Sequence, residues 1–267
     1  MKKIIDILLD ILTFVFGRTF FYSFNIVMLK VILRFLGYNN YKNFKHSGEI
    51  NFLKKVCRQK PELCIDIGAN VGNYSLFFLK STATKVIAFE PMPILFNKLK
   101  KIKNIYPERF FIYNLGLGEN NEIKKLNYNS KNLQWSNFNP EVNKINYLRS
   151  NNRNIECKII TLDEFVKKNK KLFLNKISLI KIDTEGYEYE VLKGALKTIN
   201  KFAPKYIQLE YNWHHLFKNI NLYHFSILLP KYNVFKILPF GNELIKIDTT
   251  RPENNYYNYS NIVFQKK

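Results

Sequence analysis

Two acidic side chains, Asp183 and Glu185, follow the apolar residues Leu179, Ile180 and Ile182. A short apolar run of this kind is typical of a buried strand, so both carboxylates are expected just beyond its end. A carboxylate there can act as a general base, or it can coordinate a divalent cation such as Mg²⁺ that acidifies a hydroxyl. The residues alone fit a structural role equally well, in which Asp183 caps the following helix and Glu185 pairs with a lysine.

A glycine-containing loop stands earlier in the chain, in the sequence Asp66-Ile67-Gly68-Ala69-Asn70-Val71-Gly72-Asn73. Glycines let a ligand approach the backbone, and the amino terminus of a helix offers free N–H groups. The loop is not the GxGxxG dinucleotide motif, because Asn70 and Asn73 stand where that motif needs glycine. The next apolar run ends at Glu90, about twenty residues on, where a carboxylate can accept hydrogen bonds from both ribose hydroxyls. Together these features predict a nucleoside-binding site.

A third group of polar residues follows the apolar run at residues 206–209, namely Glu210 and then His214 and His215. In open α/β sheets, ligands bind beyond the carboxyl ends of the strands. Glu210 is therefore predicted to line an acceptor pocket, and His214 is a candidate for catalysis. The alternative for the two histidines is a solvated or core position, which is the more common one.

The elements that must position these residues alternate along the chain. Strands are expected at residues 63–67, 85–89, 110–113, 155–161, 179–182, 206–209, 234–238 and 262–264, and helices at 73–80, 94–105 and 191–199. Residues 120–128 are expected to form a hairpin, and residues 129–154 a polar, asparagine-rich insertion. Strands that alternate with helices predict an α/β domain with a doubly wound, mostly parallel sheet.

The motifs resemble those of the FkbM-type methyltransferases, which use S-adenosylmethionine, from about Leu63 to the carboxyl terminus. The glycine loop is similar to the family's cofactor loop, and Phe89-Glu90-Pro91 to its ribose-binding acid. The most specific match is Ile180-Lys181-Ile182-Asp183-Thr184-Glu185-Gly186-Tyr187-Glu188, followed by Val191-Leu192-Lys193-Gly194-Ala195. Weaker matches are Thr161-Leu162-Asp163 and Pro204-Lys205-Tyr206-Ile207-Gln208-Leu209-Glu210. The sequence departs from the family at Asn114-Leu115-Gly116-Leu117-Gly118, where alanine is more usual near position 116.

This resemblance implies the seven-stranded-type sheet of the Rossmann-like methyltransferase fold and O-methylation of a hydroxyl, often on a sugar or a small natural product. It implies cofactor contacts at Asp66, Gly68, Asn70, Gly72, Asn73, Glu90, Pro91, Asn114 and Leu115. It also favours a part in the reaction for Asp183 and Glu185, as a base or as metal ligands. We favour a cell-surface glycan, or its nucleotide- or lipid-linked precursor, as the acceptor.

The amino terminus is strongly apolar over residues 4–36 but carries charged side chains, and its longest uncharged run covers only residues 19–29. A membrane span needs roughly 18 apolar residues, so a span is not expected. One narrow polar stripe falls at helical spacing: Asp6, Asp10, Thr13 and Gly17. Two amphipathic helices follow from this pattern, which either lie peripherally on a membrane through residues 1–36 or pack on the domain. No Ala-x-Ala cleavage site is present, so a signal peptide is not expected.

The division of the chain and its compartment are further expectations. Residues 1–45 are predicted to form a helical extension with a linker, and residues 46–267 the methyltransferase domain. The three cysteines, Cys57, Cys64 and Cys157, contain no CxxC pair, which fits a reducing compartment. We therefore expect a cytoplasmic protein, peripheral on the inner face of the membrane.

The charge of the chain leaves two alternatives to consider. Lys and Arg number 42 against 21 Asp and Glu, so the net charge is +21, which favours anionic surroundings. An A+T-rich coding bias explains the same lysines more plainly. An RNA methyltransferase is one alternative, but no RNA-binding module is recognisable, so no specific nucleic acid is expected. A non-catalytic binding or scaffold protein is the other, and the intact loop and Glu90 speak against it.

Overall fold

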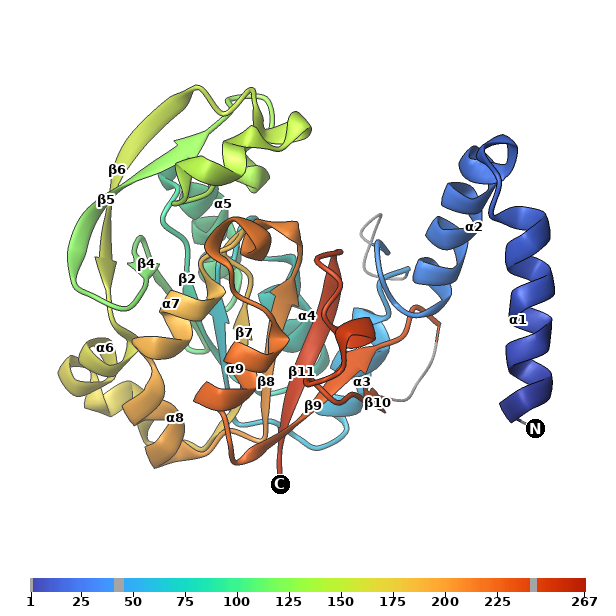
Figure 1. Ribbon diagram of the computed structural model, residues 1–267. Coiled ribbons are helices and arrows are strands. Elements are labelled where there is room, and N and C mark those ends of the chain that lie inside the picture. The colour runs from blue at the N-terminus through green and yellow to red at the C-terminus, as the bar shows by residue number, and fades with distance from the viewer. Residues whose placement is uncertain (1, 41–45, 241–243) are drawn as a thin grey trace.

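The computed structural model describes residues 2–40, 46–240 and 244–267, and its centre is an eight-stranded sheet (Figure 1). The strand order is β10-β9-β11-β8-β7-β1-β2-β3. The strands are β1 (Leu63–Ile67), β2 (Lys85–Phe89), β3 (Phe110–Tyr113), β7 (Ile177–Ile182), β8 (Tyr206–Tyr211), β9 (Tyr232–Ile237), β10 (Leu244–Lys246) and β11 (Ser260–Lys266). Strands β3, β2, β1, β7 and β8 run parallel, and β11 is antiparallel to both β8 and β9. The predicted doubly wound, mostly parallel sheet is confirmed, with β10 as an additional edge strand.

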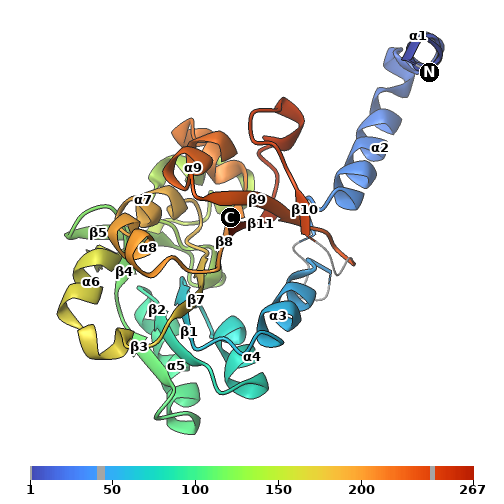
Figure 2. The same cartoon turned by 90° about the horizontal axis from the view of Figure 1, so that it is seen from below.

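Helices cover both faces of this sheet (Figure 2). One face carries α3 (Glu49–Cys57), α4 (Asn73–Ser81) and α5 (Pro93–Ile105), and the other carries α6 (Leu162–Lys168), α7 (Glu188–Lys193), α8 (Leu196–Phe202) and α9 (Leu222–Leu228). Alternate residues of the parallel strands point to opposite faces, so each face has its own apolar core. The predicted helix at 191–199 is divided at Gly194, where a β-carbon would lie 1.9 Å from the Gly118 carbonyl oxygen. That close approach ends α7 and begins α8.

A second, three-stranded sheet lies beyond the carboxyl ends of the central strands (Figure 1). It consists of β4 (Gly116–Leu117), β6 (Arg153–Ile160) and β5 (Glu122–Tyr128), in that order. The predicted hairpin at 120–128 is wrong, because β5 is one continuous strand that pairs antiparallel with β6. The chain between these strands forms the short 3-10 helices η2 (Leu133–Trp135), η3 (Pro140–Lys144) and η4 (Asn146–Leu148).

The amino-terminal helices project from the body of the molecule (Figures 1 and 2). They are α1 (Lys2–Phe16) and α2 (Tyr22–Phe35), joined by the 3-10 helix η1 (Thr19–Phe21). Residues 3–15 of α1 are all exposed, and α2 buries only Leu33. The alternative that these helices pack on the domain therefore does not hold for the described residues. Among those residues, no helix is both long enough and apolar enough to span a membrane.

The remaining short helices connect the strands. They are η5 (Lys170–Phe173), η6 (Trp213–Lys218) and η7 (Pro252–Asn254).

After α2, the chain contacts the body of the molecule at Tyr38 and Asn39. Tyr38 is buried, and the Asn39 N–H donates to the Tyr259 carbonyl oxygen at 2.8 Å.

Candidate active site

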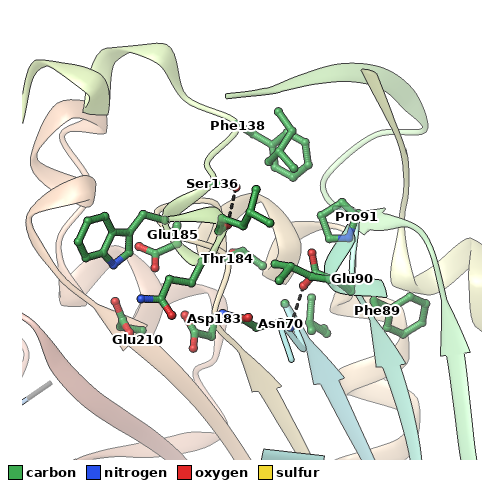
Figure 3. Close-up of a pocket in the computed structure, with 18 of the residues that line it drawn as sticks. Asn70, Phe89, Glu90, Pro91, Ser136, Phe138, Asp183, Thr184, Glu185 and Glu210 are labelled. Atoms are coloured by element: carbon green, nitrogen blue, oxygen red, sulfur yellow. Dashed lines mark hydrogen bonds between the residues drawn. The ribbon is translucent and has the colours of Figure 1, made fainter. Parts of the chain in front are cut away.

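A pocket of about 900 Å³ opens at the carboxyl ends of β1, β2, β7 and β8, and the insertion after β5 covers part of it (Figure 3). Nine of the thirteen residues predicted for catalysis or cofactor binding line it: Gly68, Asn70, Asn73, Glu90, Pro91, Leu115, Asp183, Glu185 and Glu210. The other four, Asp66, Gly72, Asn114 and His214, are absent from the lining. The structure thus brings the two acidic motifs and the glycine loop to one cavity.

The glycine loop turns sharply between β1 and α4. Gly68 has a φ of +79°, and a β-carbon there would lie 1.8 Å from the Asp183 carbonyl oxygen, so a larger residue does not fit. Asn70 also adopts the left-handed conformation, with a φ of 53°. Its N–H then points at the carboxylate of Glu90, which accepts the hydrogen bond through Oε2 at 2.7 Å (Figure 3). The loop is thereby fastened to the end of β2.

Glu90 is held by two backbone groups. Besides the bond from Asn70, Oε1 accepts the Met92 N–H at 2.9 Å. The side chain is 5% exposed, and burial raises its pKa to about 7, although the two N–H bonds act in the opposite direction. Each carboxylate oxygen has a second lone pair, so a ligand in the pocket can still donate to both.

Three of the predicted cofactor residues support this arrangement from outside the cavity. Asp66 is buried and accepts the Ser75 hydroxyl at 2.6 Å. Asn114 donates from Nδ2 to the carbonyl oxygens of Glu90 and Pro91, at 2.8 and 3.0 Å. Gly72, with a φ of +86°, is closely surrounded by side chains of α5. These positions hold the loop and the strand end in place, and none of them reaches the cavity.

The opposite end of the pocket contains three carboxylates. Asp183 and Glu185 follow β7, Glu210 belongs to β8, and one oxygen of each lies within 4.8 Å of the others. Asp183 accepts a hydrogen bond from Lys181 Nζ at 3.0 Å, and Glu210 accepts one from Asn212 Nδ2 at 2.6 Å. We name Asp183, Glu185 and Glu210 the acidic cluster.

Asp183 is not a helix cap, because α7 begins after Tyr187 without a side-chain cap.

The acidic cluster is electrostatically crowded. Burial, together with the neighbouring carboxylates, raises the pKa of Glu185 and of Glu210 well above the usual range. Burial alone would lower the pKa of Lys181, but the charges of Asp183, Asp66 and Glu49 outweigh it and raise that pKa. Lys181 is therefore a permanent cation beneath the cluster. The raised pKa values make these carboxylates more basic than ordinary ones, and such a group of oxygens can also hold a divalent cation.

A buried glutamate supports the segment that carries Glu185. Glu188 accepts the N–H groups of Thr184 and Gly186 through Oε1, at 2.8 and 3.2 Å. Its Oε2 lies 2.9 Å from His215 Nε2. Burial opposes ionisation of Glu188, but the hydrogen bond and charge of His215 and the backbone N–H groups outweigh it and lower the pKa to about 2.

His214 lies beneath the same segment. It is fully buried, and its Nδ1 is 3.3 Å from Glu185 Oε2. Burial lowers its pKa to about 4, so the ring is neutral at pH 7. A β-carbon on Gly186 would lie 2.6 Å from the His214 β-carbon. The histidine therefore packs behind Glu185 and is absent from the pocket lining.

Several lining residues were not anticipated from the sequence. The insertion contributes a cover to the pocket through Leu133, Gln134, Trp135, Ser136 and Phe138. Glu49, from the start of α3, also lines it and accepts Gln208 Nε2 at 2.8 Å. The insertion carries the one signal that could have identified its role, namely large apolar residues within an otherwise polar run. No signal marks Glu49.

Comparisons with known proteins agree on the class of protein. A sequence model of the methyltransferase FkbM domain matches residues 66–237. Hexuronic acid methyltransferase AglP of Haloferax volcanii is 28% identical over 148 residues, which is 53% of this chain and 54% of AglP. The match therefore spans about half the length of that relative.

Two of the solved structures with a similar fold are described as a methyltransferase and a putative methyltransferase. Precorrin-6y C5,15-methyltransferase from Geobacter metallireducens GS-15 is 11% identical, with a TM-score of 0.43, over 83% of this chain and 88% of that one. SMU.1697c from Streptococcus mutans, solved in complex with SAH, is 12% identical, with a TM-score of 0.44, over 82% of this chain and 97% of that one. The matched residues 66–237 contain the glycine loop, Glu90 and the acidic cluster, and the chain belongs to the FkbM methyltransferase family.

Proposed function

We propose that this protein transfers a methyl group from S-adenosylmethionine to a sugar hydroxyl, on a cell-surface glycan or its precursor. One observation carries the proposal: a single cavity of about 900 Å³ joins the buried carboxylate of Glu90 to the acidic cluster. The first end suits a ribose, and the second end suits a hydroxyl that must lose a proton. Both halves of a methyl transfer therefore have a place in the same cavity.

The residues at the Glu90 end fit S-adenosylmethionine. Glu90 keeps one free lone pair on each oxygen for the ribose hydroxyls, because each oxygen accepts only one backbone N–H. Gly68 exposes backbone where a side chain could not fit. Pro91 and Leu115 give the cavity apolar walls beside this acid, which suit an adenine ring. When bound, S-adenosylmethionine supplies an electrophilic methyl group.

The acidic cluster would prepare the acceptor. A base works best when its pKa is near the operating pH, and burial moves Glu185 and Glu210 in that direction. Lys181 neutralises part of the charge and holds Asp183 in place. The same oxygens would also fit Mg²⁺, which prefers carboxylate ligands and would lower the pKa of a bound hydroxyl. Both versions give the cluster the same task, removal of the hydroxyl proton.

The sugar acceptor is supported by two findings. The relative AglP is named a hexuronic acid methyltransferase. The side chains of Trp135 and Trp213 line the pocket, and their flat faces match the apolar face of a sugar ring. An anionic sugar would place its carboxylate away from the acidic cluster, since like charges repel.

The test is incubation of the purified protein with labelled S-adenosylmethionine and, in parallel, a total glycan extract or total RNA. The proposal expects label in carbohydrate and none in RNA, with turnover lowered about a hundredfold or more by Asp183→Asn. The exposed Glu108→Gln variant is the control, because it changes the charge equally and leaves the pocket intact. Label in RNA alone would assign the protein to RNA methylation. No heat on titration with S-adenosylmethionine would indicate a non-catalytic protein. Loss of turnover with a chelator, restored by Mg²⁺, would favour the metal version.

A further inference from the structure

A second pocket, of about 410 Å³, lies where α2 meets the body of the molecule, against β9 and β10. Its lining includes Phe35 and Leu36 from the end of α2, together with Ile245 from β10, and all three side chains are exposed. Its lining also includes three cations and one acid: Lys236, Lys246, Arg251 and Asp248. An apolar rim beside an excess of positive charge matches a molecule that has an anionic head and an apolar tail.

Lys236 is the unusual member of this lining. Its side chain is 5% exposed, and Nζ lies 3.8 Å from the ring centroid of Tyr38. Within the described residues, no carboxylate lies within ion-pair distance of it. Burial lowers its pKa to about 8, so the side chain is still mostly protonated at pH 7. A buried cation that lines a cavity, with no ion-pair partner among the described residues, gives an external anion a favourable place to bind.

The projecting helices end directly at this pocket. Most of the exposed large apolar side chains of the described chain lie between Ile4 and Leu36, on and between α1 and α2. An apolar surface of that size calls for a partner that covers it. Helix α1 has 15 residues and α2 has 14, too few for either to cross a bilayer, but an interfacial position is open to both.

Charge decides between the two partners that could cover these helices. A second copy of the chain would bring together two molecules of charge +21, which repel each other. An anionic membrane attracts the same charge, at about 1 kcal/mol for each Lys or Arg near its surface. Arg18 lies in the turn between the helices, and Lys30 and Arg34 lie on α2. An anionic lipid surface is therefore the better match.

We propose that α1 and α2 lie in the surface of an anionic phospholipid membrane, and that the pocket around Lys236 binds the phosphate of one lipid headgroup. Phe35, Leu36 and Ile245 then contact the acyl chains of that lipid. This inference is independent of the methyl transfer proposed above. It places the enzyme on the membrane without a spanning helix, within reach of a lipid-linked acceptor.

The test is binding of the full chain to vesicles of phosphatidylglycerol, with vesicles of phosphatidylcholine as the neutral comparison. The wild-type protein should bind the anionic vesicles more tightly. Lys236→Met should weaken that binding about tenfold or more, the lower range for loss of a charge-assisted hydrogen bond. Lys236→Arg should retain most of it. Lys101→Met, at an exposed position on α5, is the matched control and should bind as the wild type does. Equal effects of the two methionine variants would overturn the headgroup site.

A second pair of variants avoids the risk that Lys236→Met does not fold. Lys246 and Arg251 are both exposed, so Lys246→Gln with Arg251→Gln should leave the fold intact. Its control is Lys170→Gln with Lys171→Gln, which removes the same charge from two exposed positions on η5. The first double variant should lose several times more affinity for phosphatidylglycerol than the second. Equal losses would show that only overall charge matters, which contradicts a specific site.

Two further measurements separate the remaining partners. Glycerol phosphate that bound the protein in a Lys236-dependent way, while vesicles did not bind, would identify a soluble phosphate and overturn the lipid surface. Sedimentation equilibrium is expected to show a monomer, or aggregation that decreases when anionic vesicles are added. If the protein forms a discrete dimer that dissociates when Leu8 and Leu12 are replaced by polar residues, a second copy covers the apolar surface. That result would overturn the proposal.

Discussion

Glu90→Gln is predicted to weaken S-adenosylmethionine binding by about tenfold to a hundredfold. The two carboxylate oxygens accept the N–H groups of Met92 and Asn70, at 2.9 and 2.7 Å. An amide offers only one oxygen, so one of these N–H groups would face an NH₂ group. The loop then loses a buried bond, at about 1–3 kcal/mol, and the ribose loses a charge-assisted bond, at about 1.5–3 kcal/mol. The fold should survive, because only part of the energy of the lost N–H bond is subtracted from the free energy of unfolding. For the affinity, about 1.4 kcal/mol of binding free energy corresponds to a tenfold change.

The raised pKa of Glu90 adds a pH dependence. If the ionised form accepts the ribose hydroxyls as proposed, affinity should increase as the pH rises through about 7. Stability responds in the opposite direction. A carboxyl group with a folded-state pKa above its ordinary value of 4.5 holds its proton more tightly in the folded chain. Its contribution to stability is therefore full below pH 4.5 and is lost as the pH rises through about 7.

Isothermal titration with S-adenosylmethionine, at several pH values on both sides of 7, measures both effects. The exposed Glu108→Gln variant controls for the change in net charge and should behave as the wild type does. In Glu90→Gln, the pH dependence near 7 should disappear together with the affinity. Wild-type affinity in a folded Glu90→Gln variant would refute the ribose assignment. A flat pH profile in the wild type would refute the argument from the raised pKa.

Three other predictions concern the rest of the pocket. Asp183→Asn should lower turnover by about a hundredfold or more in a steady-state assay with little change in cofactor affinity, since it removes charge needed for proton removal; near-normal turnover would return Asp183 to a structural role. Gly68→Ala should abolish cofactor binding in a titration and destabilise the fold by about 1–3 kcal/mol, because its β-carbon would lie 1.8 Å from the Asp183 carbonyl oxygen. Glu188→Gln should lower the free energy of unfolding in urea by about 3–5 kcal/mol, as expected when a buried pair with His215 is broken. In the wild type, the contribution of Glu188 to the free energy of unfolding should be lost as the pH falls from 4.5, its ordinary pKa, toward its lowered pKa of about 2.

The central sheet could be predicted from the sequence because its parallel strands are buried on both faces. Each such strand is a short apolar run, and the glycine loop and Glu90 mark where two of them end. The hairpin expected at residues 120–128 is wrong, because the partner of β5 is β6, which lies beyond the whole insertion, and no local pattern reports a distant pairing. Strand β10 has only three residues at the sheet edge, too few for any periodicity to show.

The cover of the pocket was not predictable from average composition. The run from Asn129 to Asn154 is polar overall, so the sequence indicated a surface insertion. In the structure Phe138 is buried, and the Asn127 N–H donates to the Asn137 carbonyl oxygen at 2.8 Å, which anchors the insertion to β5. A few apolar residues and one backbone bridge decide where the segment lies. Their effect depends on the cavity beneath them, which a local pattern does not describe.

The segment after β7 shows why a choice between a chemical and a structural role for its acids was too simple. Glu185 and Gly186 both have left-handed backbones, with φ of 53° and 93°, a conformation that needs support at a residue other than glycine. Glu188 supplies that support through the Thr184 and Gly186 N–H groups, and its pairing with His215 keeps it ionised. One acid of the segment therefore shapes the backbone, and this shape turns Glu185 toward Asp183 and Glu210. The spacing of the motif therefore has a structural purpose beside the proposed chemical one, because the acidic cluster keeps its geometry only while the buried Glu188 holds the loop.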